Sequence, residues 1–191
     1  MFSPVILILG AGPNIGQHVA KTFAAGGYKV AAARSVKEAE STDSQLNIPS
    51  DFIKSDDVVN AFSEVKKVFG IPSVFVYNGR HRLQTAACQC GADVYHDKQY
   101  SEYGDHPELH FAGHGKSAGA HMMWAAADAY KSKGYKSCYA DERKANGTAK
   151  YMVEGHAHAK LFKGLAEEKM QGPWHQTFVM GKGYQMFASS L

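Results

Sequence analysis

The sequence predicts an α/β fold: a doubly wound parallel sheet flanked by helices, built as a single domain over residues 1–191. Short apolar runs alternate with segments of helical period through the first half of the chain. The runs are apolar at successive positions, which is typical of parallel strands buried on both faces. The 45% hydrophobic and 20% charged content is that of a globular protein, and 191 residues suit one domain.

Composition excludes several classes of protein. The net charge of +3 is small, and no basic run is interleaved with aromatic residues, so we expect no nucleic-acid partner. The amino terminus lacks the features of a signal peptide, and its apolar stretch is too short to span a bilayer, so we expect no membrane association. Three cysteines, an odd number, argue against a disulfide framework and predict a cytoplasmic protein.

Strands and helices alternate clearly over the first 79 residues. The predicted strands are Val5–Leu9, Lys29–Ala33, Asp51–Lys54 and Ser73–Tyr77. The predicted helices cover about 14–25, 36–45 (short) and 55–69, and Ser55 or Asp56 is the expected N-cap of the third. Glycines follow the first and third helices, where helices commonly end.

The second half is less regular. Residues Arg80–His114 have no clear period, although a structureless loop of that length is improbable in a compact domain. Pro107, Gly113 and Gly115 argue against a helix there. Beyond it we predict helices at 116–133 and 155–169, and strands at 135–139 and 176–179.

A glycine-rich turn, Gly10–Gly16, follows the first strand and leads into the first helix. In this context glycines let the backbone amides approach a pyrophosphate, whose charge is favoured at the helix amino terminus. The turn therefore predicts a dinucleotide site in a Rossmann-type sheet. The alternative is a turn that keeps its structural role without binding.

Three segments resemble fungal members of the short-chain dehydrogenase/reductase family: GAGPNIG at 10–16, GKSA.AH at 115–121 and YADERK.NG at 139–147. The resemblance covers about 1–79 and 113–191. It implies a Rossmann-type NAD(P)-binding domain and an oxidoreductase acting on a small carbonyl or alcohol substrate.

The resemblance also implies which residues bind the cofactor. Asn14 stands where the usual pattern has glycine, and asparagine adopts left-handed conformations more readily than most residues. Arg34 follows the second strand, where a guanidinium suits a 2′-phosphate, so we expect NADP rather than NAD. The complete set is Gly10, Gly12, Asn14, Ile15, Gly16, Arg34, Ser35, Asp56, Asn78, Gly79 and Lys116.

The catalytic residues of the family are matched only in part. Lys116 fits the lysine that binds the nicotinamide ribose and lowers the pKa of a catalytic tyrosine four residues earlier, where this chain has Ala112. The family's carbonyl-polarising serine or threonine is not found. Because the central segment is short, either the sheet lacks one central strand or 80–114 supplies a substitute, for which Glu108–Ala112 is the best candidate and Ala92–Tyr95 the second.

Two functions stay open. The first is an NADP-dependent oxidoreductase with a small-molecule substrate and, as in many family members, a homodimer. The second is a catalytically silent Rossmann protein that binds a nucleotide or acts through its surface. Asp141 and Arg143 are expected in a loop after a strand, contacting substrate or each other.

Metal binding is a minor alternative for the central segment. Cys88 and Cys90 are closer in sequence than the cysteine pairs of structural zinc sites, so we predict no metal centre. The histidines of the segment are interpreted as loop residues: His81, His96, His106, His110 and His114. His156 and His158 are expected at the surface.

Overall fold

A computed structural model describes residues 3–34, 41–52, 54–78, 93–96 and 107–187, with the backbone alone described at 93–96 and 107–118. One eight-stranded sheet runs through the molecule in the order β3-β2-β1-β4-β5-β6-β7-β8. Neighbouring strands are parallel up to β7, and β8 is antiparallel to β7. The predicted doubly wound parallel sheet is therefore confirmed.

The strands are β1 (Val5–Leu9), β2 (Lys29–Arg34), β3 (Gln45–Pro49), β4 (Val74–Tyr77), β5 (Asp93–His96), β6 (Ser137–Arg143), β7 (His175–Val179) and β8 (Gly183–Tyr184). The helices are α1 (Ile15–Ala25), α2 (Ser55–Val68), α3 (Pro107–Tyr130), the single-turn η1 (Lys131–Lys133) and α4 (Gly155–Glu167). The short β7–β8 pairing was not expected from the sequence.

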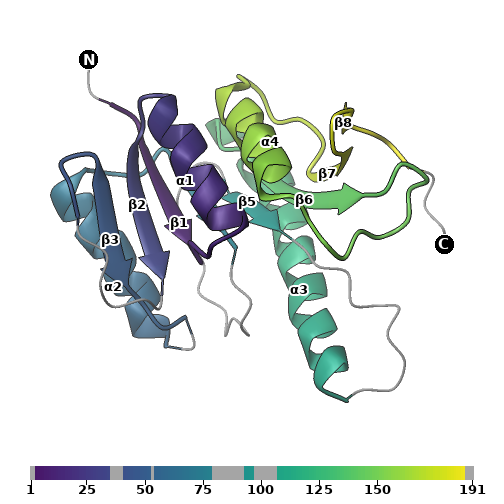
Figure 1. Ribbon diagram of the computed structural model, residues 1–191, viewed down its shortest axis with the longest axis horizontal. Helices are drawn as coiled ribbons and strands as arrows, with labels where there is room; N and C mark the ends of the chain where they lie inside the picture. The colour runs from purple at the N-terminus through teal and green to yellow at the C-terminus, as the bar shows by residue number, and fades with distance from the viewer. Residues whose placement is uncertain (1–2, 35–40, 53, 79–92, 97–106, 188–191) are drawn as a thin grey trace.

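Two hydrophobic clusters cover the two faces of the sheet. On one face α1 and α4 lie side by side, and Val19, Phe23 and Phe162 pack there against Ile6 and Ile8 of β1 (Figure 1). On the other face α2 packs on the strands through its buried residues, and α3 contacts β5 and β6. Since β1 serves both clusters, all five of its residues are buried, as its continuous apolar run predicts.

No central strand is missing from the sheet. Residues Asp93–His96 form β5, which pairs in parallel with β4 on one side and β6 on the other. The preferred candidate for a substitute strand, Glu108–Ala112, is therefore wrong, since it lies in α3, whereas the second candidate, Ala92–Tyr95, is correct within one position. Four residues are enough because interior strands are held by ladders on both edges.

The third strand is Gln45–Pro49, so the prediction of Asp51–Lys54 is wrong. Asp51 instead lies before α2, and its N–H donates to Asp57 Oδ2 at 2.7 Å. Asp57 thereby supports the start of α2, whose N-cap is Lys54 without a side-chain cap, rather than Ser55 or Asp56. Of the short helix expected at 36–45, residues 36–40 lie outside the described residues and 41–45 are not helical.

The helix α3 begins at Pro107, nine residues before the predicted start at Lys116. The argument that Pro107, Gly113 and Gly115 exclude a helix is therefore wrong. Proline is tolerated in the first turn, where its missing N–H has no intrahelical partner to lose, and a glycine costs only about 1 kcal/mol relative to alanine.

Candidate functional site

The glycine-rich turn is fastened to the end of β2. Gly10 has a φ of 87°, a conformation that favours glycine. The N–H groups of Gly10 and Ala11 both donate to the carbonyl oxygen of Ala33, at 3.0 and 3.1 Å. Asn78, which follows β4, donates from Nδ2 to the carbonyl oxygen of Gly10 at 3.1 Å. The turn is thus held from both neighbouring strands at the carboxyl edge of the sheet.

Two glycines of the turn have different roles in space. A Cβ on Gly16 would lie 2.5 Å from Ala11 Cα and 2.9 Å from the carbonyl oxygen of Gly10. Gly16 therefore permits the close approach of α1 to the turn. A Cβ on Gly12 would meet only the oxygen of Gly10, at 4.0 Å, so the space beside Gly12 is open.

The first turn of α1 presents N–H donors at this edge. Gln17 N donates to the carbonyl oxygen of Gly12 at 2.9 Å, and His18 N to that of Asn14 at 3.2 Å. Among the described residues, the N–H groups of Ile15 and Gly16 have no such acceptor in the turn. Together with the positive end of the helix dipole, they favour an anion.

Asn14, which stands where the usual pattern has glycine, does not adopt a left-handed conformation. Its φ is −94°, and its side chain makes no cap hydrogen bond to α1. Instead Nδ2 donates to the carbonyl oxygen of Val153 at 3.0 Å, and Oδ1 accepts from the N–H of Gly155 at 3.0 Å. Asn14 therefore joins the turn to the connection between β6 and α4.

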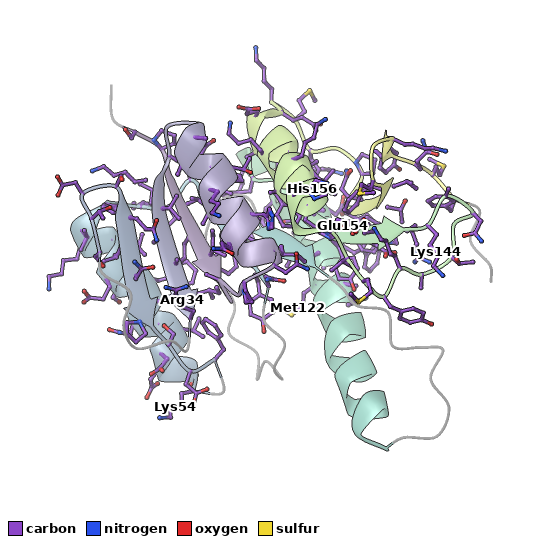
Figure 2. The ribbon with its side chains drawn as sticks, in the orientation of Figure 1. Arg34, Lys54, Met122, Lys144, Glu154 and His156 are labelled. Carbon is purple, nitrogen blue, oxygen red and sulfur yellow. The ribbon has the colours of Figure 1, made fainter. Side chains whose placement is uncertain are left out.

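Arg34 is the last residue of β2, and its backbone carbonyl accepts from Ser50 N at 2.9 Å. Its Nε is buried without a hydrogen-bond partner among the described residues. Figure 2 shows Arg34 and Lys54 at the same edge of the molecule. Asp56 is exposed in the first turn of α2, which begins at this edge, whereas Ser35 and Gly79 lie outside the described residues.

Lys116 lies in the first half of α3, with its side chain outside the described part of the chain. Ala112 lies one turn earlier on the same helix face, since residues four apart are stacked. The tyrosine position implied by the resemblance is thus on the expected helix but holds a residue without a proton to donate. The structure brings the turn, Arg34 and Asn78 together and leaves the placement of the Lys116 side chain open.

Asp141 and Arg143 belong to β6 itself, not to a loop. Arg143 donates from Nη2 and Nε to Asp141 Oδ2 at 2.5 and 2.6 Å, and His175 Nε2 lies 3.3 Å from the same oxygen. Burial of Asp141 disfavours ionisation, but the hydrogen bonds from His175 and Arg143 outweigh it and hold the carboxyl pKa below its ordinary value. Of the two roles considered for this pair, the ion pair is the one observed.

A second charged cluster is buried on the opposite face of β6. Glu142 and His158 have fully buried side chains, and Lys150 Nζ lies 2.7 Å from Glu142 Oε1. The expectation that His158 lies at the surface is therefore wrong. His158, Phe162 and Leu165 share one face of α4, a spacing that signals burial of the histidine. Burial lowers the pKa of His158.

Within the described ranges no group of three or more metal-ligating side chains is assembled, and the side chains of the central cysteines and histidines fall outside those ranges. The interpretation of these histidines as loop residues is wrong for three of them, because His96 lies in β5 and His110 and His114 lie in α3. Cys138 is buried, which raises the pKa of its thiol to about 11 and makes it unreactive as a thiolate.

A cavity of about 460 Å³ lies between α4, β7 and β8, and none of the predicted site residues lines it. None of the described helices has the length and hydropathy of a membrane span.

Comparison with known proteins identifies the family. No protein-family model matches the chain. A short chain dehydrogenase/reductase, dmxR12 from Cryptosporiopsis sp. (strain 8999), is 36% identical over 236 residues, covering 98% of this chain and 96% of that protein. The short-chain dehydrogenase/reductase from Serratia marcescens BCRC 10948 superposes with a TM-score of 0.66 at 14% identity, covering 94% and 97% of the two chains.

Two solved structures carry a nucleotide. ElxO with NADP bound superposes with a TM-score of 0.68 at 16% identity, covering 93% of this chain and 97% of that one. The NADH-dependent reductase A1-R' complexed with NAD gives a TM-score of 0.67 at 12% identity, covering 86% and 89%. These likenesses show the fold. With the fold, the turn and a relative 36% identical over nearly the whole chain, the protein belongs to the short-chain dehydrogenase/reductase family.

Proposed function

We propose that this protein is an NADP-dependent oxidoreductase acting on a small carbonyl or alcohol substrate. The observation that carries the proposal is the anion-binding character of the carboxyl edge. There the open space at Gly12, the N–H groups of Ile15 and Gly16, and the buried Nε of Arg34 occur together. The NADP bound to ElxO and the NAD bound to A1-R' support a nicotinamide dinucleotide as the class of cofactor.

The described residues fit a dinucleotide. The pyrophosphate would lie beside Gly12 and accept from the first turn of α1. Asn78, bonded to Gly10, and the neighbouring Gly79 would line the ribose side, and Asp56 would lie near the adenine. A buried guanidine nitrogen without a partner favours an anionic one, so Arg34, with Ser35 beside it, would bind the 2′-phosphate that distinguishes NADP from NAD.

A nicotinamide cofactor supplies a hydride to a carbonyl carbon or takes one from an alcohol. The protein's part is to bind and orient. Lys116 would hold the nicotinamide ribose from α3, in agreement with its match to the family lysine. Because Ala112 carries no hydroxyl, proton transfer at the substrate oxygen would follow another route than in family members with a tyrosine at that place.

Titration of NADPH and NADH by cofactor fluorescence tests cofactor binding. We expect saturable NADPH binding and weaker NADH binding by the wild type. Arg34→Asp should weaken NADPH binding more than NADH binding, since it places a negative charge where the 2′-phosphate would lie. Equal losses for both cofactors would refute the NADP preference, and no fluorescence change at millimolar NADPH would refute cofactor binding.

One observation favours a second function, a catalytically silent Rossmann protein that binds the nucleotide. Ala112 leaves α3 without a proton donor at the family's tyrosine position. A panel of small aldehydes and ketones followed at 340 nm separates the two functions. Oxidation of NADPH by any of them supports the oxidoreductase, whereas saturable binding without turnover across the panel selects the silent protein.

We also propose a homodimer formed through α3. Met122, Trp124 and Tyr130 are large apolar residues exposed on this helix, with 41%, 51% and 45% of their surface accessible. Light scattering coupled to size exclusion should give twice the monomer mass for the wild type and a monomer for Trp124→Glu. A wild-type monomer at micromolar concentration would contradict the dimer.

A further inference from the structure

The side chains of Asn14 and Glu142 hydrogen-bond to the backbone of three successive residues where the β6–α4 connection enters α4: Val153, Glu154 and Gly155. From one side Asn14 accepts from the N–H of Gly155 and donates to the carbonyl oxygen of Val153, both at 3.0 Å. From the other side Glu142 Oε2 accepts from the N–H of Glu154 at 2.7 Å. The segment is therefore held between the glycine-rich turn and the end of β6.

On the β6 side, the segment is held by Glu142, whose side chain is buried. Glu142 has no exposed side-chain surface, and its second oxygen accepts from Lys150 Nζ at 2.7 Å. His158 Nδ1 lies 3.0 Å from the carbonyl oxygen of Glu154. A charged, fully buried carboxylate with both oxygens bonded fixes the position of the backbone that it contacts. Figure 2 shows Glu154 and His156 where this connection enters α4.

On the turn side, the hydrogen bonds of Asn14 affect which N–H groups of α1 stay available. An asparagine at an N-cap normally uses its side-chain oxygen to accept from the second or third N–H of the helix. In α1 the second of these, the N–H of Gly16, is among the donors that a phosphate at the turn would need, whereas the third, that of Gln17, already donates to Gly12. Asn14 makes no such cap bond and directs its side chain to residues 139 and 141 positions away. The anion-binding face of α1 is thus left open while the turn is still held.

We propose that Asn14 is a positioning residue for the cofactor: it clamps the β6–α4 connection, anchored by Glu142, to the glycine-rich turn and so pre-forms the phosphate site. This proposal rests on the proposed function, since it assigns Asn14 an indirect part in binding the dinucleotide. A clamp that is already formed spares the cofactor the cost of ordering the turn, so its loss should appear as weaker binding.

Gly155 offers a second way to test the clamp without changing Asn14. A Cβ at Gly155 would lie 2.5 Å from Asn14 Oδ1 and 2.7 Å from His18 Nδ1. The same Cβ would lie 2.8 Å from the backbone carbonyl carbon of Asn14, so Gly155→Ala would displace both the side chain and the backbone of Asn14 from the opposite side. Gln17→Ala is the matched control, because Gln17 is exposed on the same helical turn and its N–H bond to Gly12 is a backbone bond.

The experiment measures amide hydrogen exchange of the cofactor-free protein and the Kd for NADPH in the wild type, Asn14→Ala, Gly155→Ala and Gln17→Ala. Asn14→Ala should speed exchange at Gly155 roughly tenfold and weaken NADPH binding roughly tenfold, as the loss of two hydrogen bonds implies. Gly155→Ala should weaken binding in the same direction, and Gln17→Ala should change neither quantity. Thermal melting confirms that each variant is folded.

The outcomes are distinct. Unchanged exchange at Gly155 in Asn14→Ala, or faster exchange with an unchanged Kd, overturns the positioning role while NADPH binding by the wild type stands. If the wild type does not bind NADPH, the proposed function fails instead. In that case, faster exchange at Gly155 in cofactor-free Asn14→Ala would show that the contact exists but only stabilises the structure. That result would also overturn the role of Asn14 in cofactor binding.

Discussion

Two regions meet at the amino terminus of α1, and they are built in opposite ways. The glycine-rich turn relies on backbone atoms and on missing side chains: Gly16 lets the helix approach, and Gly10 and Ala11 share the carbonyl oxygen of Ala33. The β6–α4 connection relies on long charged side chains that are buried, with Glu142 at its centre. The free energy of unfolding should therefore fall when atoms are added to the glycine-rich turn, and when a charged side chain is removed from the region around Glu142.

The largest effect is expected from removing the charge at the centre of the second region. Glu142→Leu leaves the N–H of Glu154 without its acceptor and leaves Lys150 Nζ only its longer contact with Glu154 Oε1, at 3.5 Å. Breaking a buried pair of this kind costs about 3 kcal/mol of unfolding free energy. Urea denaturation measures the loss. Glu167→Leu is the control, because Glu167 pairs with Lys163 at the surface and such pairs contribute about 0.5 kcal/mol. Equal losses in the two variants would contradict the comparison.

Adding one methyl group should harm the first region. Gly16→Ala places a Cβ 2.5 Å from the backbone of Ala11, and overpacking of this kind costs about 2 kcal/mol of unfolding free energy. Gly12→Ala adds the same group where the nearest neighbour is 4.0 Å away, so its unfolding free energy should change by less than about 0.5 kcal/mol. If both variants unfold alike, the close approach at Gly16 does not matter for stability.

A smaller effect concerns pH. Burial lowers the pKa of His158 in the folded protein, so the unfolded chain binds a proton that the folded one does not. Stability should therefore fall as pH drops below about 6.5, with a slope of at most about 1.4 kcal/mol per pH unit. Asp141, whose pKa is lowered from 3.8, would affect stability only in more acidic solution.

The substitution His158→Gln should remove this part of the pH dependence between pH 5 and 6.5, because glutamine does not titrate. His156→Gln, at an exposed neighbour on the same helix, should leave the dependence as it is in the wild type. Thermal melting at several pH values measures both. The same slope in all three proteins would show that His158 is not its source.

Much of the fold could be predicted because its signals are local. The apolar run Val5–Leu9, the glycines that follow helices and the spacing of buried residues in α1 and α2 are read directly from neighbouring positions. The third strand was predicted at the wrong place, at Asp51–Lys54, directly before the third helix. The true strand, β3, has only two large apolar residues, Leu46 and Ile48, which alternate with polar ones. A half-exposed edge strand gives a weaker signal than a buried one.

The central segment could not be predicted from its own residues. The four-residue β5 becomes a strand because β4 and β6 leave one place between them, and that information is not local. The 236-residue alignment with dmxR12 is 45 positions longer than this 191-residue chain, so this chain is shorter than its relative. Pairing partners, not composition, set this part of the fold.

The residues of the candidate site also fall into those that the sequence indicated and those that it did not. The turn and Arg34 were visible from their places after strands, whereas the contact of Asn14 with Val153 and Gly155 joins residues about 140 positions apart. The burial of Glu142 and His158 was likewise missed, because charged residues are expected at the surface unless a partner is known. Lys150, the ion-pair partner of Glu142, lies in an irregular connection that carries no periodic signal.

The most direct test of the proposed cofactor site is a calorimetric titration of NADPH into the wild type and Gly12→Ala. The methyl group of Gly12→Ala fills the open space beside the turn and leaves the packing of α1 intact. We predict saturable binding by the wild type and at least a tenfold higher Kd for Gly12→Ala at an unchanged melting temperature. Equal affinities, or no binding heat from the wild type, would contradict a dinucleotide site at this turn.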